Sequence, residues 1–225
     1  MSASIPVKKP RTAAERQARL RQIFVELDRL FPHVSCALQH TNAWELLVAT
    51  ILSAQCTDER VNMVTPGLFK KYPTVGDFAR VTPEELGQDI RSTGFYNNKA
   101  KNVIGAARQV LTAFGGDVPR TMDEMLTIPG AARKTANVVL GTAYGIAVGV
   151  VVDTHMIRLA NRLDLTQESD PVKIEKDLMK LVPQERWIQF SHQMIHHGRG
   201  LCNARKPQCG ECPMNHLCYA GDKVR

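Results

Sequence analysis

Four cysteines lie close together near the end of the chain. Cys202, Cys209, Cys212 and Cys218 fall within 17 residues in the pattern C-x6-C-x2-C-x5-C. Thiolates at this spacing can converge on one metal centre, either a zinc ion or an iron–sulfur cluster. Disulfides, or buried cysteines acting as small hydrophobic residues, are the alternatives, and neither suits a polar loop in a reducing compartment. Zinc sites usually pair two C-x2–4-C units and this loop has one, so the spacing favours a [4Fe–4S] cluster.

Lys134 is a second candidate for chemistry. It lies in the segment I-P-G-A-A-R-K-T-A, which predicts two helices joined by a tight turn at Gly130. A glycine there can adopt a positive φ or let a phosphate oxygen approach, and the unpaired N–H groups of the following helix favour an anion. The helix dipole and Arg133 disfavour the charged form of Lys134, and a neutral amine can form a Schiff base. Lys134 could equally be one more phosphate contact, and the residues alone do not separate the two roles.

Asp153 follows an apolar stretch in the segment V-V-V-D-T-H. Its carboxylate can act as the N-cap of the next helix. A carboxylate fixed in that way can also accept protons or stabilise developing positive charge. For His155, two residues on, a structural hydrogen bond is the default interpretation.

Three basic residues, Arg199, Arg205 and Lys206, surround the cysteine-rich loop. Ordinary solvated charge would account for them. We favour a second interpretation, in which a metal centre braces the loop and its basic residues contact phosphate groups.

The composition describes a basic protein with a substantial core. Of 225 residues, 44% are hydrophobic, and 29 basic against 22 acidic residues give a net charge of +7. This excess favours a polyanionic partner, although only weakly. No apolar run reaches the roughly 18–20 residues needed to span a bilayer, so we expect no membrane partner. The N-terminus lacks the apolar segment of a secretory signal, although its shortage of acidic residues would also fit a transit peptide.

Apolar residues recur at helical spacing along nearly the whole chain, with no convincing strand pair or internal repeat. We expect a disordered arm over residues 1–10, and N-caps at Asn42, Asp58, Thr82 and Asp153. Three glycines interrupt the apolar stretch 138–152, which predicts a buried helix followed by an irregular segment. The expected helices cover residues 11–31, 44–53, 58–72, a segment from 83, 98–114, 121–127, 133–144, 154–162, 171–181 and 184–197.

Together these residues resemble the endonuclease III family of DNA glycosylases, from about Arg16 to Cys218. The segments that carry the resemblance, besides the cysteine pattern, are L-S-A-Q-C-T-D (52–58), G-F-Y-N-N-K-A (94–100), I-P-G-A-A-R-K-T-A-N-V-V (128–139), V-D-T-H (152–155) and H-G-R (197–199). The resemblance implies an all-α fold of two helical domains flanking a DNA-binding cleft, with a helix–hairpin–helix motif and a C-terminal [4Fe–4S] loop. A helical barrel would span 36–147, and an iron–sulfur domain would join 11–35 to 148–225.

The resemblance also implies a bifunctional DNA glycosylase and AP lyase of base excision repair, acting on oxidised or ring-damaged pyrimidines in duplex DNA. The damaged nucleotide would be flipped out of the helix, and Lys134 would attack its sugar C1′ with help from Asp153. A Schiff base would form, and β-elimination would cut the strand. Gln55 would fill the gap left by the nucleotide, and Phe95 would wedge into the stack opposite. The remaining DNA contacts would come from Gly130, Ala132, Arg133, His155, Arg199, Arg205 and Lys206.

Three departures from the family pattern stand out. Ala132 replaces the second glycine of the hairpin, and a positive φ there would cost about 1 kcal/mol. Phe95 stands where a leucine is common, which could shift lesion or opposite-base preference. The segment between Lys134 and Asp153 is one residue longer than usual, around 145–150, which bears on their relative geometry.

Two other functions remain open at this point. A monofunctional glycosylase of the same superfamily would generally lack the lysine at position 134. A catalytically weak, DNA-binding iron–sulfur protein would fit the change at Ala132. In every case we expect double-stranded DNA with damaged bases or abasic sites as the partner, a monomer, and a cytoplasmic, nucleoid-associated protein of bacterial type.

Overall fold

The computed structural model describes residues 9–223, and the regular elements in that range are all helices, without a strand. The expected all-α fold is therefore confirmed. Most of the segment expected as a disordered arm, residues 1–8, lies outside the described residues. Lys9 is described, and its ammonium pairs with Asp164 at 2.9 Å. The chain divides into two compact units, one of residues 1–35 with 149–225 and the other of residues 36–148.

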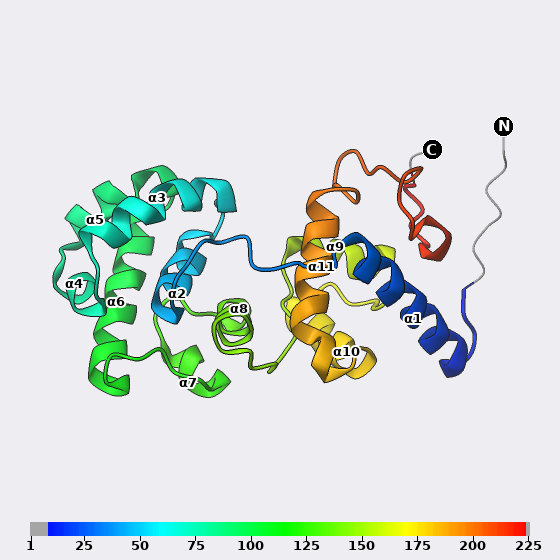
Figure 1. The fold of residues 1–225 in the computed structure, drawn as a ribbon, viewed down its shortest axis with the longest axis horizontal. Coiled ribbons are helices and arrows are strands. Elements are labelled where there is room, and N and C mark those ends of the chain that lie inside the picture. Colours follow the sequence, from blue (N-terminus) through cyan, green and yellow to red (C-terminus); the bar gives the residue numbers. More distant parts are fainter. Residues whose placement is uncertain (1–8, 224–225) are drawn as a thin grey trace. The chain divides into compact units, whose positions relative to one another are not determined.

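The unit of residues 36–148 is built around a long helix, α6 (Tyr96–Phe114), against which two short helices pack. These are α4 (Val75–Arg80) and α5 (Pro83–Asp89). Figure 1 shows α3 (Asp58–Lys71) near the upper end of α6. Phe78 is fully buried at the centre, with the Trp44 ring 5.5 Å away in an edge-on contact.

A second group of helices in this unit carries the hairpin. The apolar α2 (Ala43–Leu52) packs against α8 (Arg133–Tyr144), and so does the short α7 (Met122–Thr127). Helix α2 is buried along most of its length, because its sequence is apolar on every face. The 3₁₀ turn η1 (Arg91–Thr93) leads into α6. Helix α8 is therefore fixed by its contacts with α2 and α7, while Lys134 in its first turn stays exposed.

The unit of residues 1–35 and 149–225 joins the two ends of the chain. Helix α1 (Ala13–Leu30) packs on α11 (Trp187–Arg199), where the rings of Phe24 and Phe190 meet edge-on at 5.8 Å. Helix α11 also packs on α9 (Thr154–Arg162), and α9 on α10 (Pro171–Leu181). Two short 3₁₀ turns complete the unit, η2 (Gln184–Arg186) and η3 (Asn215–Leu217).

The close packing of α11 on α9 explains why the H-G-R segment has a glycine, Gly198. A Cβ atom at this position would lie 2.9 Å from the His155 Cβ atom, which is closer than side chains tolerate. The glycine therefore lets α11 approach α9 closely at the end of the helix that precedes the cysteine loop.

Most sequence-based element predictions are confirmed, and the errors are local. Asn42, Thr82 and Asp153 accept the expected N-cap hydrogen bonds, but Asp58 does not. Thr57 caps α3 instead, at 3.2 Å from the Arg60 amide, so Asp58 is the first residue inside the helix. Helix α4 was not predicted, because 6 residues are too few to show a helical period.

The apolar stretch 138–152 behaves as expected. Helix α8 ends at Tyr144, where Gly145 adopts a φ of +68°, and an irregular segment follows up to Asp153. Among the described residues, no helix combines the length and apolar character needed to cross a membrane.

Candidate functional site

The hairpin between α7 and α8 has the geometry expected of a phosphate-binding turn. Gly130 has a φ of +79°, and a Cβ atom there would lie 3.0 Å from the Cβ atom of Asn102. Both facts favour glycine, since L-residues rarely adopt this conformation and a Cβ atom would have to push Asn102 aside. The turn is closed by the Ala131 amide, which donates to the Ile128 carbonyl at 3.0 Å.

Ala132 is the N-cap of α8 and places no side-chain oxygen on the first-turn amides. Helix N-termini without such a cap favour an anion, because several N–H groups point outward at the positive end of the dipole. The φ of Ala132 is −73°, which suits any L-residue. The strain that would follow from a positive φ at this position is therefore absent, and replacing a glycine here costs the turn nothing.

Lys134 lies in the exposed first turn of α8, next to the half-buried Arg133. Within the described residues its ammonium makes no hydrogen bond or ion pair, so the amine is accessible from solvent. Asp153 and His155 belong to the other unit. The half-buried Asp153 accepts the Met156 amide at 2.8 Å as the N-cap of α9, and that bond occupies one carboxylate oxygen.

His155 has the structural contact that was its default interpretation. Its Nδ1 atom lies 3.3 Å from the Arg158 guanidinium, and its side chain packs against Gly198. Arg158 donates to the carbonyls of Gly198 and Cys202, at 2.8 and 2.9 Å. His155 therefore helps to hold the start of the cysteine loop, and a DNA contact from it stays a prediction.

Gln55 and Phe95 are exposed and share an unusual backbone conformation. Their φ angles are +53° and +49°, and Asp164 is the only other non-glycine residue in the described part of the chain with a positive φ. Phe95 precedes α6 and its side chain is 63% exposed, so it is not packed on the core as a loop residue ordinarily would be. Residues held in strained conformations with large exposed side chains often mark functional sites.

The four C-terminal cysteines line a single cavity. Leu159, Leu163 and Met214 also line it, and its empty space is about 450 Å³, including the part open to solvent. None of the six cysteines of the chain forms a disulfide, so that alternative is wrong. No group of three His, Cys, Asp or Glu side chains among residues 9–223 is arranged to hold a single metal ion.

The chemistry of the cysteine cavity suits an iron–sulfur cluster. Burial raises the pKa of the Cys212 thiol to about 11. Four thiolates in such surroundings are unfavourable unless positive charge compensates them, and iron ions supply that charge. Four thiols that line one cavity provide the four-cysteine ligand set of an iron–sulfur cluster. The residues present therefore fit the group.

Two arginines that the sequence did not single out hold the cysteine loop in place. Arg162 donates to the Cys202 Sγ atom at 3.3 Å and pairs with Asp222. Arg19, on α1, donates to the carbonyls of Leu163 and Leu217. Its guanidinium carbon also lies 4.4 Å from the centre of the Tyr219 ring. Both side chains bridge segments that lie far apart in the sequence, and no local pattern could have indicated these contacts.

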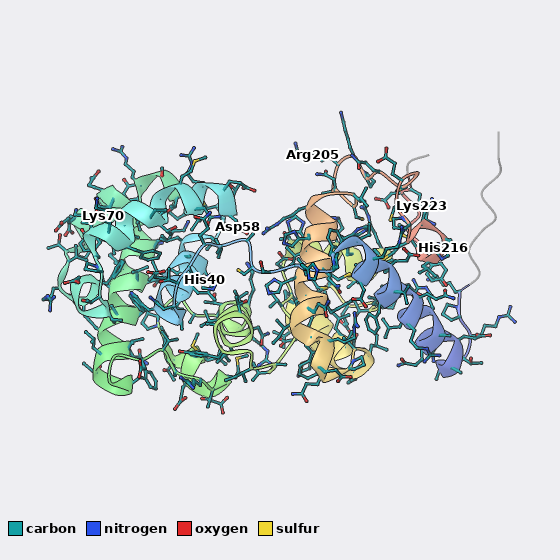
Figure 2. All side chains as sticks on the ribbon, viewed as in Figure 1. His40, Asp58, Lys70, Arg205, His216 and Lys223 are labelled. Atoms are coloured by element: carbon teal, nitrogen blue, oxygen red, sulfur yellow. The ribbon has the colours of Figure 1, made fainter. Side chains whose placement is uncertain are left out.

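The three basic residues predicted to contact phosphate groups, Arg199, Arg205 and Lys206, are all exposed. Arg199 ends α11, and Arg205 and Lys206 lie on the loop itself. Figure 2 labels Arg205 on this loop, together with Lys223 and His216 near the C-terminal end. The Arg205 amide donates to the Asn203 side chain at 3.0 Å, which fixes the backbone of the loop tip.

Comparison with known proteins agrees with this fold and these sites. A family model described as HhH-GPD superfamily base excision DNA repair protein matches residues 48–184. A second model, the iron-sulfur binding domain of endonuclease III, matches residues 202–218. The helical hairpin and the cysteine loop thus define a base excision DNA repair protein with an iron–sulfur domain.

Individual relatives narrow the class further. The chain is 54% identical to endonuclease III of Synechocystis sp., over 92% of this chain and 95% of that protein. It is also similar to the solved structures of a non-covalent endonuclease III–DNA complex and of a trapped endonuclease III–DNA covalent intermediate. Each has a TM-score of 0.86 and 45% identity, covering 90% of this chain and 94% and 95% of the respective structures. The chain belongs to the endonuclease III family, and its cofactor is a [4Fe–4S] cluster.

A first prediction concerns the hairpin. We expect Gly130→Ala to weaken binding to duplex DNA by about tenfold, because a Cβ atom at φ +79° must displace Asn102 or distort the turn. Ala132→Gly is the matched control and should change the Kd by less than about threefold, since position 132 already has an ordinary φ. Fluorescence anisotropy at one fixed salt concentration measures both. Equal effects of the two substitutions would contradict the anchoring role of the turn.

A second prediction concerns the cysteine loop. Cys212→Ser should yield protein that lacks the visible absorption of an iron–sulfur cluster and most of its iron and sulfide, because a hydroxyl is a poor ligand for iron. Cys36→Ser, at a half-buried cysteine of the other unit, should keep full iron and sulfide content. Loss of iron from both variants, or from neither, would rule out this assignment.

Proposed function

We propose that this protein removes oxidised or ring-damaged pyrimidines from duplex DNA and then cleaves the strand at the emptied site through Schiff-base chemistry at Lys134. As a member of the endonuclease III family it is a bifunctional DNA glycosylase and AP lyase of base excision repair. The observation that carries the proposal is an accessible lysine in the first turn of an uncapped helix, directly after the hairpin glycine.

The hairpin would grip DNA without reading its sequence. A phosphate group at the start of α8 would accept the outward-facing first-turn amides, and Gly130 leaves no side chain in its way. Arg133 adds positive charge at the same end of the helix. This arrangement fixes the register of the sugar–phosphate backbone relative to Lys134.

Lys134 would act as the nucleophile. In its neutral form its Nζ atom attacks the sugar C1′ atom, and the bond to the base breaks with the electron pair leaving on the base. Opening of the sugar ring gives a Schiff base between Nζ and C1′. Loss of a proton from C2′ then expels the 3′ oxygen with its phosphate, which is β-elimination. Phosphate groups near the helix start would hold the sugar within reach of the amine.

Asp153 would assist the departure of the base and the proton transfers. Its N-cap bond to the Met156 amide fixes one carboxylate oxygen and so orients the other. Gln55 would occupy the space left by the extruded nucleotide, and the exposed ring of Phe95 would enter the opposite stack. Extrusion costs about a few kcal/mol and costs least at poorly stacked bases, which contributes to selection of damage.

Cys202, Cys209, Cys212 and Cys218 would hold the [4Fe–4S] cluster. When bound, the cluster supplies the positive charge that four buried thiolates require, and so cross-links the loop. The loop would then present Arg205 and Lys206 for phosphate binding. Arg199 precedes the loop in sequence, and His155 contacts Arg158, which binds the loop's first cysteine; both would add to this binding.

The proposed partner is double-stranded DNA that contains damaged bases or abasic sites. Both solved relatives described above are endonuclease III–DNA complexes, which supports DNA as the ligand. We further propose that the protein acts as a monomer and works on the bacterial-type nucleoid, where such DNA lies.

The third prediction tests Lys134. Lys134→Ala should lower strand cleavage by more than about a thousandfold and abolish the covalent adduct that borohydride traps on duplex DNA containing thymine glycol. The Kd for the same duplex should change by less than about threefold, because the hairpin amides remain. Lys176→Ala, at an exposed lysine on α10, is the control and should leave trapping intact. A parallel loss of binding and cleavage would make Lys134 a phosphate contact instead.

The fourth prediction separates the two roles of Asp153. Asparagine is as good an N-cap as aspartate, so Asp153→Asn should change the free energy of unfolding by less than about 0.5 kcal/mol. Base release should nevertheless slow by about 10²–10⁴-fold, because the charge is lost. Asp170→Asn makes the same change at the N-cap of α10, where the carboxylate accepts the Lys173 amide at 3.0 Å. Both variants are assayed for melting temperature and single-turnover base release, and similar rates in the two would leave Asp153 as a cap alone.

A further inference from the structure

Lys99 is a buried lysine that pairs with no carboxylate in the described part of the chain. Its side chain lies on α6 and the residue is 4% exposed. The Nζ atom donates to the Leu52 carbonyl at 2.7 Å and to the Thr93 carbonyl at 2.8 Å. Burial lowers the pKa of this ammonium. A buried charge with only neutral partners is unfavourable for folding, so its presence calls for an explanation in the site.

The two carbonyls belong to the turns that carry Gln55 and Phe95. Leu52 is the last residue of α2, where carbonyls lack partners within the helix, and Gln55 follows three residues later. Thr93 ends η1 and comes two residues before Phe95. The two turns are 40 residues apart in the sequence, and one ammonium group links them.

The backbone of Lys99 also contacts the turn that carries Phe95. Its amide donates to the Phe95 carbonyl at 3.1 Å, which begins the hydrogen bonding of α6. One residue therefore binds the carbonyls of Leu52, Thr93 and Phe95. Gln55 and Phe95 both have a positive φ, and such conformations persist only where the surrounding structure fixes them.

We infer that Lys99 is a positioning residue for nucleotide extrusion, which holds the turns of Gln55 and Phe95 at a fixed separation so that both side chains enter the duplex together. The inference rests on the proposed function of those two side chains. A lysine suits this task because its ammonium can donate to two carbonyls from different segments at once. An apolar residue of the same length would fill the volume but leave both carbonyls buried without a partner.

The test compares two kinds of DNA. Lys99→Met keeps the aliphatic stem and removes the donors, and Lys101→Met is the control at an exposed lysine on the same helix. Extrusion is followed by stopped-flow fluorescence of 2-aminopurine beside thymine glycol in a duplex. We expect Lys99→Met to slow extrusion and base release by about tenfold or more, and Lys101→Met by less than about twofold. Cleavage of a single-stranded abasic substrate, which requires no extrusion, should stay within about twofold of the parent protein for both.

A double-mutant cycle tests whether Lys99 affects the rate of extrusion through Phe95. If Lys99 acts through the wedge, Lys99→Met should slow extrusion much less in a Phe95→Ala background than in the parent protein. Additive effects, or an equal loss on duplex and single-stranded substrates, would overturn the inference. If Phe95→Ala and Gln55→Ala themselves leave extrusion unchanged, the proposed role of these side chains fails first, and that result is distinct from a failure of Lys99 alone.

A milder variant keeps the test valid if Lys99→Met folds poorly. Lys99→Gln retains an amide donor on a shorter stem. Hydrogen exchange in this variant should rise at the amides of residues 53–57 and 93–96 and stay unchanged in α4 and α5. Exchange that rises uniformly across the unit would show a general stabilising role and overturn the inference.

Discussion

The start of α8 is the feature on which the rest of the site depends. Most of the described α-helices begin with a side chain that accepts a first-turn amide, for example Thr57, Thr121, Asp153 and Asp170, whereas α6, α8 and α11 do not. Helix α8 begins with Ala132, which cannot do so. The positive end of the helix is thus left for an external anion, which under the proposed function would be a DNA phosphate group. Because α2 and α7 pack against α8, the helix would stay fixed while it holds that phosphate.

The backbone groups of the cysteine loop need hydrogen-bond partners from other segments, since an irregular segment cannot pair all of its own N–H and carbonyl groups. Arg19, Arg158 and Arg162 donate to carbonyls or sulfur in segments that come from distant parts of the sequence. The planar, permanently charged guanidinium suits this work better than an ammonium, because it presents several donors in fixed directions. With these contacts and the cluster in place, the basic loop tip would keep one conformation in which to meet DNA, as we propose.

The sequence alone predicts most helices, because apolar periodicity and capping residues are local signals. The bounds of α8, α9 and α10 agree with the prediction to the residue. The error at Asp58 arose because Thr57 and Asp58 are both good caps, and only the backbone decides which one is used. The burial of Lys99 was not predictable, since its carbonyl partners lie 47 and 6 residues away and carry no sequence signature. Ala132 was suspected of strain because sequence does not give φ.

Strain and buried charge occur together at the turn that carries the exposed Phe95 ring. Each positive φ at a non-glycine residue costs about 1 kcal/mol, and a lysine without a carboxylate partner adds a desolvation cost. Without supporting contacts, a turn with such a φ would relax to a less strained conformation. Three carbonyls bound by Lys99 prevent that relaxation, and the buried core of α2 and α6 supplies the stability that offsets the strain. If Phe95 is the wedge that we propose, its turn would be ordered before DNA binds, and less of the binding energy would be lost in ordering it.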